Sequence, residues 1–432
     1  MKRSLPLAAA LLAAILLLRA STGHCGRIYV DITSPELRKI PIAVPYFLDT
    51  GRPGPALDPG KEMSAWLDRA LTFHGFIAVL DPKTYGGVQD AAWKDLKMDF
   101  TILGSYDLEG SIISMEMRLL DLRNEEPSML LGRRYRGEWA QRQTMIRRFC
   151  DEVILQLTGE RGVSLTRIAF VSDHTGNKEV FLADVLGDSV RQVTAHHSIT
   201  ASPRFAPDGR RLAYVSLHRD NPNLYITDLS QDKYTKAIST QKGLNMAAAW
   251  SPDGGSLAIT LSVDGNPDLY LIGLDGRVQR RLTSGAGINV SPSWSPDGKR
   301  IAFCSDRAGN PQIFVMDVAS GAVQRLTYEG RYNTAPAWSP DGKWIAFTGQ
   351  VERFHNLFLV SPDGGAPTQL TPGGADHEAP SWSPDSRQIV FTRGNGRKSD
   401  ICTIFSQGGA IRTLLPMAGN QSSPQWSPRL EE

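Results

Sequence analysis

The chain has 432 residues, of which 41% are hydrophobic and 21% charged, values of an ordinary globular protein that argue against global disorder. Its 47 basic and 45 acidic side chains give a net charge of +2, so the composition gives no reason to expect nucleic acid as a partner. At this length the chain has room for two or three domains with well-buried cores.

Residues 1–23 have the layout of a secretory signal peptide. A basic start at Lys2 and Arg3 precedes an unbroken apolar run from Leu7 to Leu18 and small residues from Ala20 onward. The run is shorter than the ~20 apolar residues that a membrane-spanning helix needs. We therefore expect export, removal of this segment, and a mature protein without stable membrane insertion.

The cysteines of this exported chain are Cys25, Cys150, Cys304 and Cys402. Cys304 and Cys402 belong to sequence repeats that are not neighbours, so their Cα atoms are not expected to come within disulfide reach. We expect buried free thiols rather than a disulfide framework.

Residues 35–160 mix strand and helix periodicities and predict a small α/β domain. Strands are expected at 40–44, 76–80, 99–106, 112–120 and 129–136, the last three as an antiparallel meander. Helices are expected from the Asp58-Pro59 cap to Gly75, near 88–96, and over 138–158 before Gly159.

The rest of the chain carries six near-copies of one pattern, which reads Trp-Ser-Pro-Asp-Gly in its cleanest form. The copies are 250–254, 294–298 and 338–342, the variants 205–209 and 382–386, and the truncated copy 426–428. Their prolines recur every 44 or 45 residues, and each of the first five copies is followed by three more strand signals. Four strands per ~44 residues are typical of a propeller blade. The sequence therefore predicts a two-domain protein, with the small α/β domain followed by a six-bladed β-propeller of four-stranded blades over 166–432.

Each part of the pattern has a structural interpretation. Asp-Gly supplies a tight turn between the first two strands of a blade, and the tryptophan fills the space between adjacent blades. The prolines two residues before the aromatic, such as Pro203, are placed at the start of the innermost strand, where ladder donors are spare. Because the first copy has three strands and 422–428 is an unmatched fourth, we expect this last segment to close the first blade.

Polar residues stand eight positions before each repeat Asp, where loops enter the innermost strands around the axis. They are Thr200, Asn245, Asn289, Asn333, His377 and Gln421. Two positions further on, all six residues are small, which we interpret as a requirement of a crowded axis. Either these polar residues cap strand starts and turns, or they form a recognition surface together with Met246, Thr334 and Glu378. Other side chains that would add to such a surface lie beside the ring, namely His196, His197, Arg331, Tyr332 and Asp376.

A catalytic interpretation has little support in the sequence. No Gly-x-Ser-x-Gly elbow occurs, and the segment before the propeller is too short for an attached hydrolase domain. His196-His197 and Asp376-His377-Glu378 contain metal-ligand types, but they belong to different blades and lack ligand spacing. We expect no cofactor, no metal and no catalytic residue; the alternative is a six-bladed hydrolase with a metal or acid/base site in its tunnel.

The repeats also read Trp-Ser-Pro-Asp-Gly-Lys-x-Ile-Ala-Phe, Ser-Asp-Arg-x-Gly-Asn-Pro-x-Ile-Phe and Arg-Leu-Thr. Together with the signal peptide and the preceding α/β domain, they resemble the TolB family, WD40-like propellers of the periplasmic Tol–Pal envelope system. The departures are Ser386 for Gly and Phe205-Ala206 for Trp-Ser.

This resemblance implies a monomeric, non-enzymatic adaptor that supports outer-membrane integrity and envelope constriction during cell division. It implies that Pal, a lipoprotein, binds the propeller face and that TolA binds the N-terminal segment 24–34. The residues concerned there are Arg27, Ile28, Tyr29, Val30, Asp31 and Ile32. Their alternating pattern suits addition of a strand to a partner's sheet, although an ordinary first strand of the α/β domain is the other interpretation.

Overall fold

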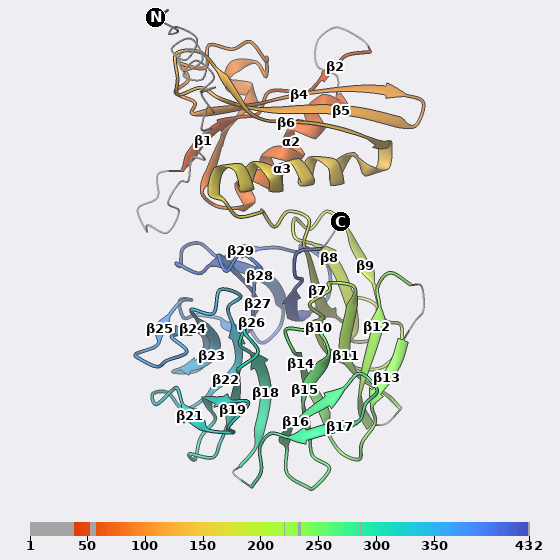
Figure 1. Ribbon diagram of the computed structural model, residues 1–432, viewed down its shortest axis with the longest axis vertical. Helices are drawn as coiled ribbons and strands as arrows, with labels where there is room; N and C mark the ends of the chain where they lie inside the picture. The colour runs from red at the N-terminus through yellow and green to blue at the C-terminus, as the bar shows by residue number, and fades with distance from the viewer. Residues whose placement is uncertain (1–38, 52–57, 220, 232–234, 286, 431–432) are drawn as a thin grey trace, which may run out of the picture.

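The computed structural model describes residues 39–51, 58–219, 221–231, 235–285 and 287–430. The expected signal peptide over 1–23 and the expected partner-binding segment over 24–34 lie outside these ranges. Figure 1 shows two domains, with the α/β domain stacked on one side of a ring of blades. None of the described helices is long and apolar enough to cross a membrane.

The N-terminal domain is a six-stranded sheet with its two helices, α2 and α3, packed against each other. Its elements are β1 (Ile40–Ala43), β2 (Leu48–Asp49), α2 (Asp58–Phe73), β3 (Ile77–Leu80), β4 (Phe100–Glu109), β5 (Ile112–Asp121), β6 (Ser128–Glu138) and α3 (Arg142–Thr158). β1 pairs in parallel with β3 and β4, and the antiparallel meander β4-β5-β6 follows as predicted. In Figure 1 α3 lies on the side of the sheet that faces the propeller.

The predicted helix near 88–96 is wrong, because this segment forms turns after the short 3-10 helix η1 (Pro82–Tyr85). Gly86 and Gly87 both have positive φ, which stops helical geometry just ahead of the segment. Val88 is 47% exposed, so the segment lacks the continuous apolar stripe that would hold a surface helix to the core.

The last helix forms where it was predicted. The 3-10 turn η2 (Trp139–Gln141) leads into α3, and Glu138 and Gln141 form a reciprocal capping box at its start. Ile146, Phe149 and Val153 are buried on one face. Gly159 ends the helix with φ +80 and donates its N–H to the carbonyl of Leu155.

Six four-stranded sheets form the propeller, which confirms the predicted fold class. Blade 1 is β30 (Gln421–Trp426), β7 (Arg167–Ser172), β8 (Glu179–Asp184) and β9 (Val190–Gln192). Blade 2 is β10 (Thr200–Phe205), β11 (Arg211–Arg219), β12 (Asn221–Asp228) and β13 (Thr235–Ser239). Blade 3 is β14 (Asn245–Trp250), β15 (Ser256–Leu261), β16 (Asp268–Gly273) and β17 (Val278–Arg281). Blade 4 is β18 (Asn289–Trp294), β19 (Arg300–Ser305), β20 (Gln312–Asp317) and β21 (Val323–Arg325). Blade 5 is β22 (Asn333–Trp338), β23 (Ile345–Val351), β24 (Phe354–Val360) and β25 (Thr368–Gln369). Blade 6 is β26 (Asp376–Trp382), β27 (Gln388–Gly394), β28 (Ser399–Phe405) and β29 (Arg412–Thr413).

The ring closes with the chain's last strand, as predicted from the strand count. β30 pairs antiparallel with β7, so that Gln421 lies opposite Ser172 and Trp426 opposite Ile168. A sheet without this strand would leave the inner edge of the first blade unpaired. Strands more than 240 residues apart in sequence are therefore joined in one blade.

The repeat tryptophans are wedges between blades. Trp250 is buried in one cluster with Val215 and Ile226 of the preceding blade. Its indole N–H donates to the carbonyl of Arg204 at 3.1 Å, and Trp294 and Trp382 make the same bond to the preceding blade at 3.2 and 2.9 Å. Trp338 differs, because its indole donates to Gly342 in its own turn at 3.3 Å. In blades 3, 4 and 6 the wedge therefore adds a directional bond to the preceding blade to its apolar packing.

The Asp-Gly turn forms as predicted. Gly298 has φ +71 and donates its N–H to the carbonyl of Ser295, while Asp297 accepts bonds from the Ser295 hydroxyl and the Lys299 N–H. Ser386 adopts φ +57 in the place of this glycine. Its hydroxyl accepts the N–H of Asp341 in the neighbouring turn at 3.0 Å, which offsets part of the conformational cost.

The small residues of the innermost strands are explained by the backbone. They have φ between +50 and +55 and are Ser202, Ala247, Ser291, Ala335, Ala379 and Ser423. Each lies at a register shift of its strand pair, which marks a β-bulge. Bulky side chains are disfavoured at left-handed φ. The prolines directly follow these bulge residues, so the prediction that the prolines begin the strand is wrong. Pro203 lies inside β10, next to the bulge that interrupts the hydrogen-bond ladder where proline has no N–H to donate.

The two domains dock through blades 1 and 6. Arg147 of α3 lies 3.1 Å from Asp184 and 2.7 Å from Asp188 of the first blade. The ring of Phe73, at the end of α2, lies 6.1 Å from the ring of Trp426. The docking side is the one that carries the Pro-Asp-Gly turns, because β7 begins opposite Trp426.

Three of the cysteines, Cys150, Cys304 and Cys402, are buried free thiols, as expected. Burial raises the pKa of all three thiols, to about 12 for Cys304. Cys25 lies outside the described ranges.

Candidate functional site: the strand-start face and the central tunnel

The propeller has two faces around its axis. We call the strand-start face the one where the six innermost strands begin, at Thr200 and its equivalents. The turn face carries the Pro-Asp-Gly turns and the docked α/β domain. Because the strands of each blade are antiparallel, the hairpin between the second and third strands, such as β11–β12, also lies on the strand-start face.

The six polar residues eight positions before the repeat Asp do lie together, at the starts of the innermost strands. Their side chains are buried, with exposures of 4% or less. Thr200 donates to the carbonyl of Lys178 at 2.8 Å, and Asn333 donates to Gln312 Oε1 and to the carbonyl of Glu329. Asn245 bonds to Ser239 and Gln241 in the loop ahead of it. These contacts support the capping interpretation, and contact of this ring with a partner stays a prediction.

His377 is the exception in the ring. Its Nδ1 is buried and has no hydrogen-bond partner among the described residues, and the ring packs edge-on against Phe391 with centroids 5.4 Å apart. Burial, with a smaller effect of Arg393, lowers the pKa of His377 to about 4. The imidazole is therefore neutral at physiological pH.

The three other residues singled out from the sequence sit one position further along the strands and are more open. Met246 is 38% exposed, Glu378 is exposed and Thr334 is half-buried. The sequence had already placed Tyr332 beside the ring, and the structure adds two neighbours that the sequence reasoning missed, Ile199 and Ile288. Ile199, Ile288 and Tyr332 each directly precede a ring residue and are 48%, 44% and 43% exposed. With Met246 they form an apolar arc on blades 2 to 5.

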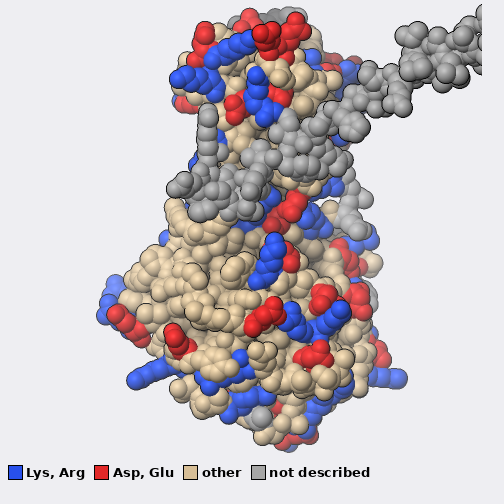
Figure 2. Space-filling view, turned by 60° about the vertical axis from the view of Figure 1, so that its left-hand side comes forward, with Lys and Arg blue, Asp and Glu red and all other residues tan. Residues whose placement is uncertain are grey.

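Blades 5, 6 and 1 present charge on the same face. His355 Nδ1 lies 3.2 Å from Asp376 and 3.3 Å from Glu378. Beside them is a cleft of about 400 Å³, whose charged lining residues are Asp173, Lys178, Asp376, Glu378, Arg397 and Lys398. Figure 2 shows charges of both signs mixed over the visible propeller surface, in keeping with the small net charge.

The histidine pair considered as metal ligands has other neighbours. His196 Nδ1 lies 2.7 Å from the hydroxyl of Ser216, and its ring is 4.4 Å from the ring of His218. The backbone N–H of His197 donates to Glu179. Within the described ranges, no three His, Cys, Asp or Glu side chains are grouped so that they could hold a metal ion.

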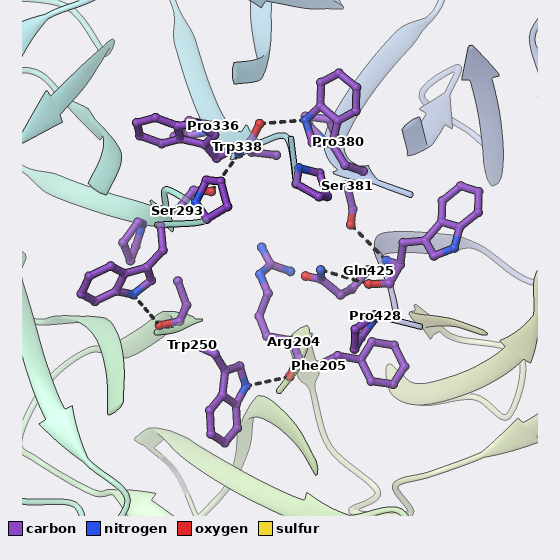
Figure 3. Close-up of a pocket in the computed structure, with 18 of the residues that line it drawn as sticks. Arg204, Phe205, Trp250, Ser293, Pro336, Trp338, Pro380, Ser381, Gln425 and Pro428 are labelled. Atoms are coloured by element: carbon purple, nitrogen blue, oxygen red, sulfur yellow. Dashed lines mark hydrogen bonds between the residues drawn. The ribbon is translucent and has the colours of Figure 1, made fainter. Parts of the chain in front are cut away.

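The central tunnel holds a cavity of about 390 Å³ toward the turn face. It is lined by the wedge aromatics, the prolines that follow them, and the bulge residues of blades 3 to 6. In the close-up of Figure 3 the side chain of Arg204 points into the middle of this space. Ser293, Ser381 and Gln425 line the same space from other blades.

Comparison with known proteins matches both domains. Residues 155–430 match the family model of the TolB beta propeller domain, and residues 28–127 match that of the TolB amino-terminal domain. Similar chains include the Tol-Pal system protein TolB of Desulfotalea psychrophila, 46% identical over 57% of this chain and 56% of that one. The same-named protein of Desulfosudis oleivorans is 39% identical over 65% of each chain. These matches span less than two thirds of either relative.

Among solved structures, the crystal structure of TolB from Acinetobacter baumannii is similar over 91% of this chain and 97% of that one. Its TM-score is 0.79 at 26% identity. Both domains and their arrangement in the sequence are thus those of known TolB proteins, and the chain belongs to the TolB family of the Tol-Pal system.

Proposed function

We propose that this chain is a monomeric periplasmic adaptor that binds Pal through the strand-start face and TolA through residues 24–34, without catalysing a reaction. Its role would be to support outer-membrane integrity and envelope constriction during division. Membership of the TolB family is the observation that carries this proposal.

The surface of the strand-start face supports a protein partner. The α/β domain docks on the turn face, so it does not occupy the apolar arc of Ile199, Met246, Ile288 and Tyr332. Tyrosine and methionine are enriched where proteins bind proteins, and aromatic anchors commonly carry most of the binding energy. The charged cleft next to the arc would set the orientation of the partner. The buried polar ring would hold the loops in place, while Met246, Thr334 and Glu378 would contact Pal.

Calorimetric titration with the periplasmic domain of Pal tests this assignment. Tyr332→Ala should weaken binding by about tenfold or more, as expected for an exposed aromatic anchor. Trp344→Ala is the matched control, because Trp344 is 41% exposed but follows a Pro-Asp-Gly turn on the turn face. Equal losses for the two variants, or no loss for Tyr332→Ala and Met246→Ser together, would place the Pal site elsewhere.

The TolA contact needs a separate test, since its segment lies outside the described ranges. Deletion of residues 24–34 should abolish binding to TolA and leave the Pal titration unchanged. Retained TolA binding would refute the assignment of this segment. Reproducible turnover of an ester or peptide by the purified chain, lost in a tunnel variant, would overturn the non-enzymatic part of the proposal.

A further inference from the structure

One blade places a cation on the axis of the tunnel. The residue before the repeat aromatic is Arg204 in blade 2, whereas the other blades have Ala249, Ser293, Ala337, Ser381 and Gln425 there. Among the described residues that line the cavity, Arg204 is the only charged one. Because the other five side chains are small or neutral, the guanidinium of Arg204 is the charged group at the centre of the ring (Figure 3).

This guanidinium has no counter-charge among the described residues. Its recorded hydrogen bond runs from Nη1 to the carbonyl of Pro203 at 2.9 Å, which uses one of five N–H donors. Burial lowers the pKa of Arg204 to about 10, and no neighbouring charge acts on it. The group is therefore still cationic at neutral pH. A cation removed from bulk water without a partner is unfavourable, and a bound anion would offset that cost.

Neutral donors surround the same space. The hydroxyls of Ser293 and Ser381 accept the backbone N–H groups of Trp338 and Trp426, each at 3.0 Å. A hydroxyl that accepts still has its own O–H to donate. The amide of Gln425 lies in the same ring, and its Nε2 uses one of its two N–H groups on the carbonyl of Trp426 at 3.3 Å. Among the described residues, the cavity is thus lined by hydrogen-bond donors and by no carboxylate, as the binding of an oxyanion requires.

We propose that the tunnel is an oxyanion site in which Arg204 binds a phosphate or carboxylate group. The cavity of about 390 Å³ has room for such a group with several waters, at ~30 Å³ of liquid volume each. The planar guanidinium can donate two hydrogen bonds side by side to two oxygens of a phosphate or a carboxylate. The site does not depend on Pal, because the proposed Pal contacts lie on the strand-start face.

Calorimetric titration of the full chain with sodium phosphate, at an ionic strength held constant with chloride, tests the site. We expect saturable binding that Arg204→Gln weakens by at least about tenfold, the loss expected for a charge-assisted contact. Arg277→Gln is the matched control, since the Arg277 side chain is 88% exposed, and it should leave binding unchanged. Circular dichroism establishes that each variant is folded.

Two further arms identify the source of the anion. Acetate, and a short peptide with a free C-terminus compared with its amide, report carboxylate binding, and competition with phosphate shows that the site is shared. Preference for phosphate indicates a free inorganic ion as the occupant, and preference for the peptide acid indicates a protein carboxylate. Should Arg204→Gln fail to fold, Arg204→Lys keeps the charge without the fork and is expected to bind more weakly. Absence of saturable binding of every anion to the unmodified chain, or equal binding by Arg204→Gln, overturns the proposal.

Discussion

Replacement of Trp426 by alanine should destabilise the chain more than most single changes, because this residue joins three parts of the structure. It lies on β30, the strand that closes the ring, and is 2% exposed. Its ring packs near Phe73 of the α/β domain, and its indole N–H donates to Thr166 Oγ1 at 2.8 Å. Closure of the ring and docking of the domains therefore share one side chain.

The magnitude follows from burial. A tryptophan removes 150–250 Å² from water, which at ~25 cal/mol per Å² is about 4–6 kcal/mol, an upper estimate because the unfolded chain is not fully extended. Truncations of buried aromatics to alanine cost about 3–5 kcal/mol. The lost indole bond adds little, since the Thr166 hydroxyl still donates to the carbonyl of Val163 at 2.6 Å. We therefore expect a loss of about 4 kcal/mol in the free energy of unfolding.

Equilibrium urea unfolding, followed by near-ultraviolet circular dichroism, measures this loss. Trp426→Phe keeps an aromatic ring without the N–H and should lose about half as much or less. Trp344→Ala, at a residue 41% exposed, should change the free energy of unfolding by less than about 1 kcal/mol. A loss below about 2 kcal/mol for Trp426→Ala would refute the claim that this residue couples closure to docking.

Three further changes probe other parts of the ring. Deletion of 420–432 removes β30, so cooperative thermal unfolding should be lost; unchanged melting would refute the closure. Because the pKa of His377 is about 4 in the folded chain and ~6.5 when unfolded, the unfolded state binds more protons between these values, and stability should fall as pH drops from ~6.5 to ~4. Three other blades have Asn at this position, so His377→Asn should be tolerated. It should remove about 1–2 kcal/mol of this pH dependence after allowance for solvent screening, measured by urea unfolding at both pH values. An unchanged dependence of the free energy of unfolding on pH would contradict the assignment. Gly298→Ala should cost about 1–2 kcal/mol through its φ of +71, since its Cβ would meet no atom closer than 3.8 Å. Gly373→Ala, at a glycine without positive φ and with open space, is the control, and an equal loss there would discount the strain.

The repeating part of this fold could be predicted from the sequence, because the residues that recur at a fixed spacing have few structural uses. A proline every 44 or 45 residues fixes the number of blades, and an unmatched strand at 422–428 can pair only with the blade that lacks one. The aromatic before Ser-Pro was assigned to a wedge from its size and its position on a strand. Its indole bond to the preceding blade depends on the position of Arg204 in space, which no local pattern contains.

The polar ring shows where sequence reasoning stops. Asn333 suits a strand cap and a partner contact equally well, and the choice is made by Gln312 and Glu329, residues whose placement needs the folded blade. The small residues before the prolines were attributed to crowding, but the left-handed backbone of the bulge is the stronger constraint. Tyr332 was recognised from the sequence as a neighbour of the ring, whereas the exposed Ile199 and Ile288 were missed, although both directly precede a ring position.

Arg204 combines a structural role and a proposed chemical role that a single variant can separate. Its backbone carbonyl accepts the Trp250 indole N–H at 3.1 Å, so this atom belongs to the contact between blades 2 and 3. Its guanidinium points the other way, into the tunnel (Figure 3). Arg204→Gln keeps the carbonyl and removes the charge, so blade packing should survive. In the absence of anions the variant should be as stable as the parent or more so, because a half-buried cation without a counter-charge in the described part of the chain is gone. If Arg204→Gln raises the free energy of unfolding and abolishes anion binding, then the arginine lowers the stability of the protein and its role is to bind the anion.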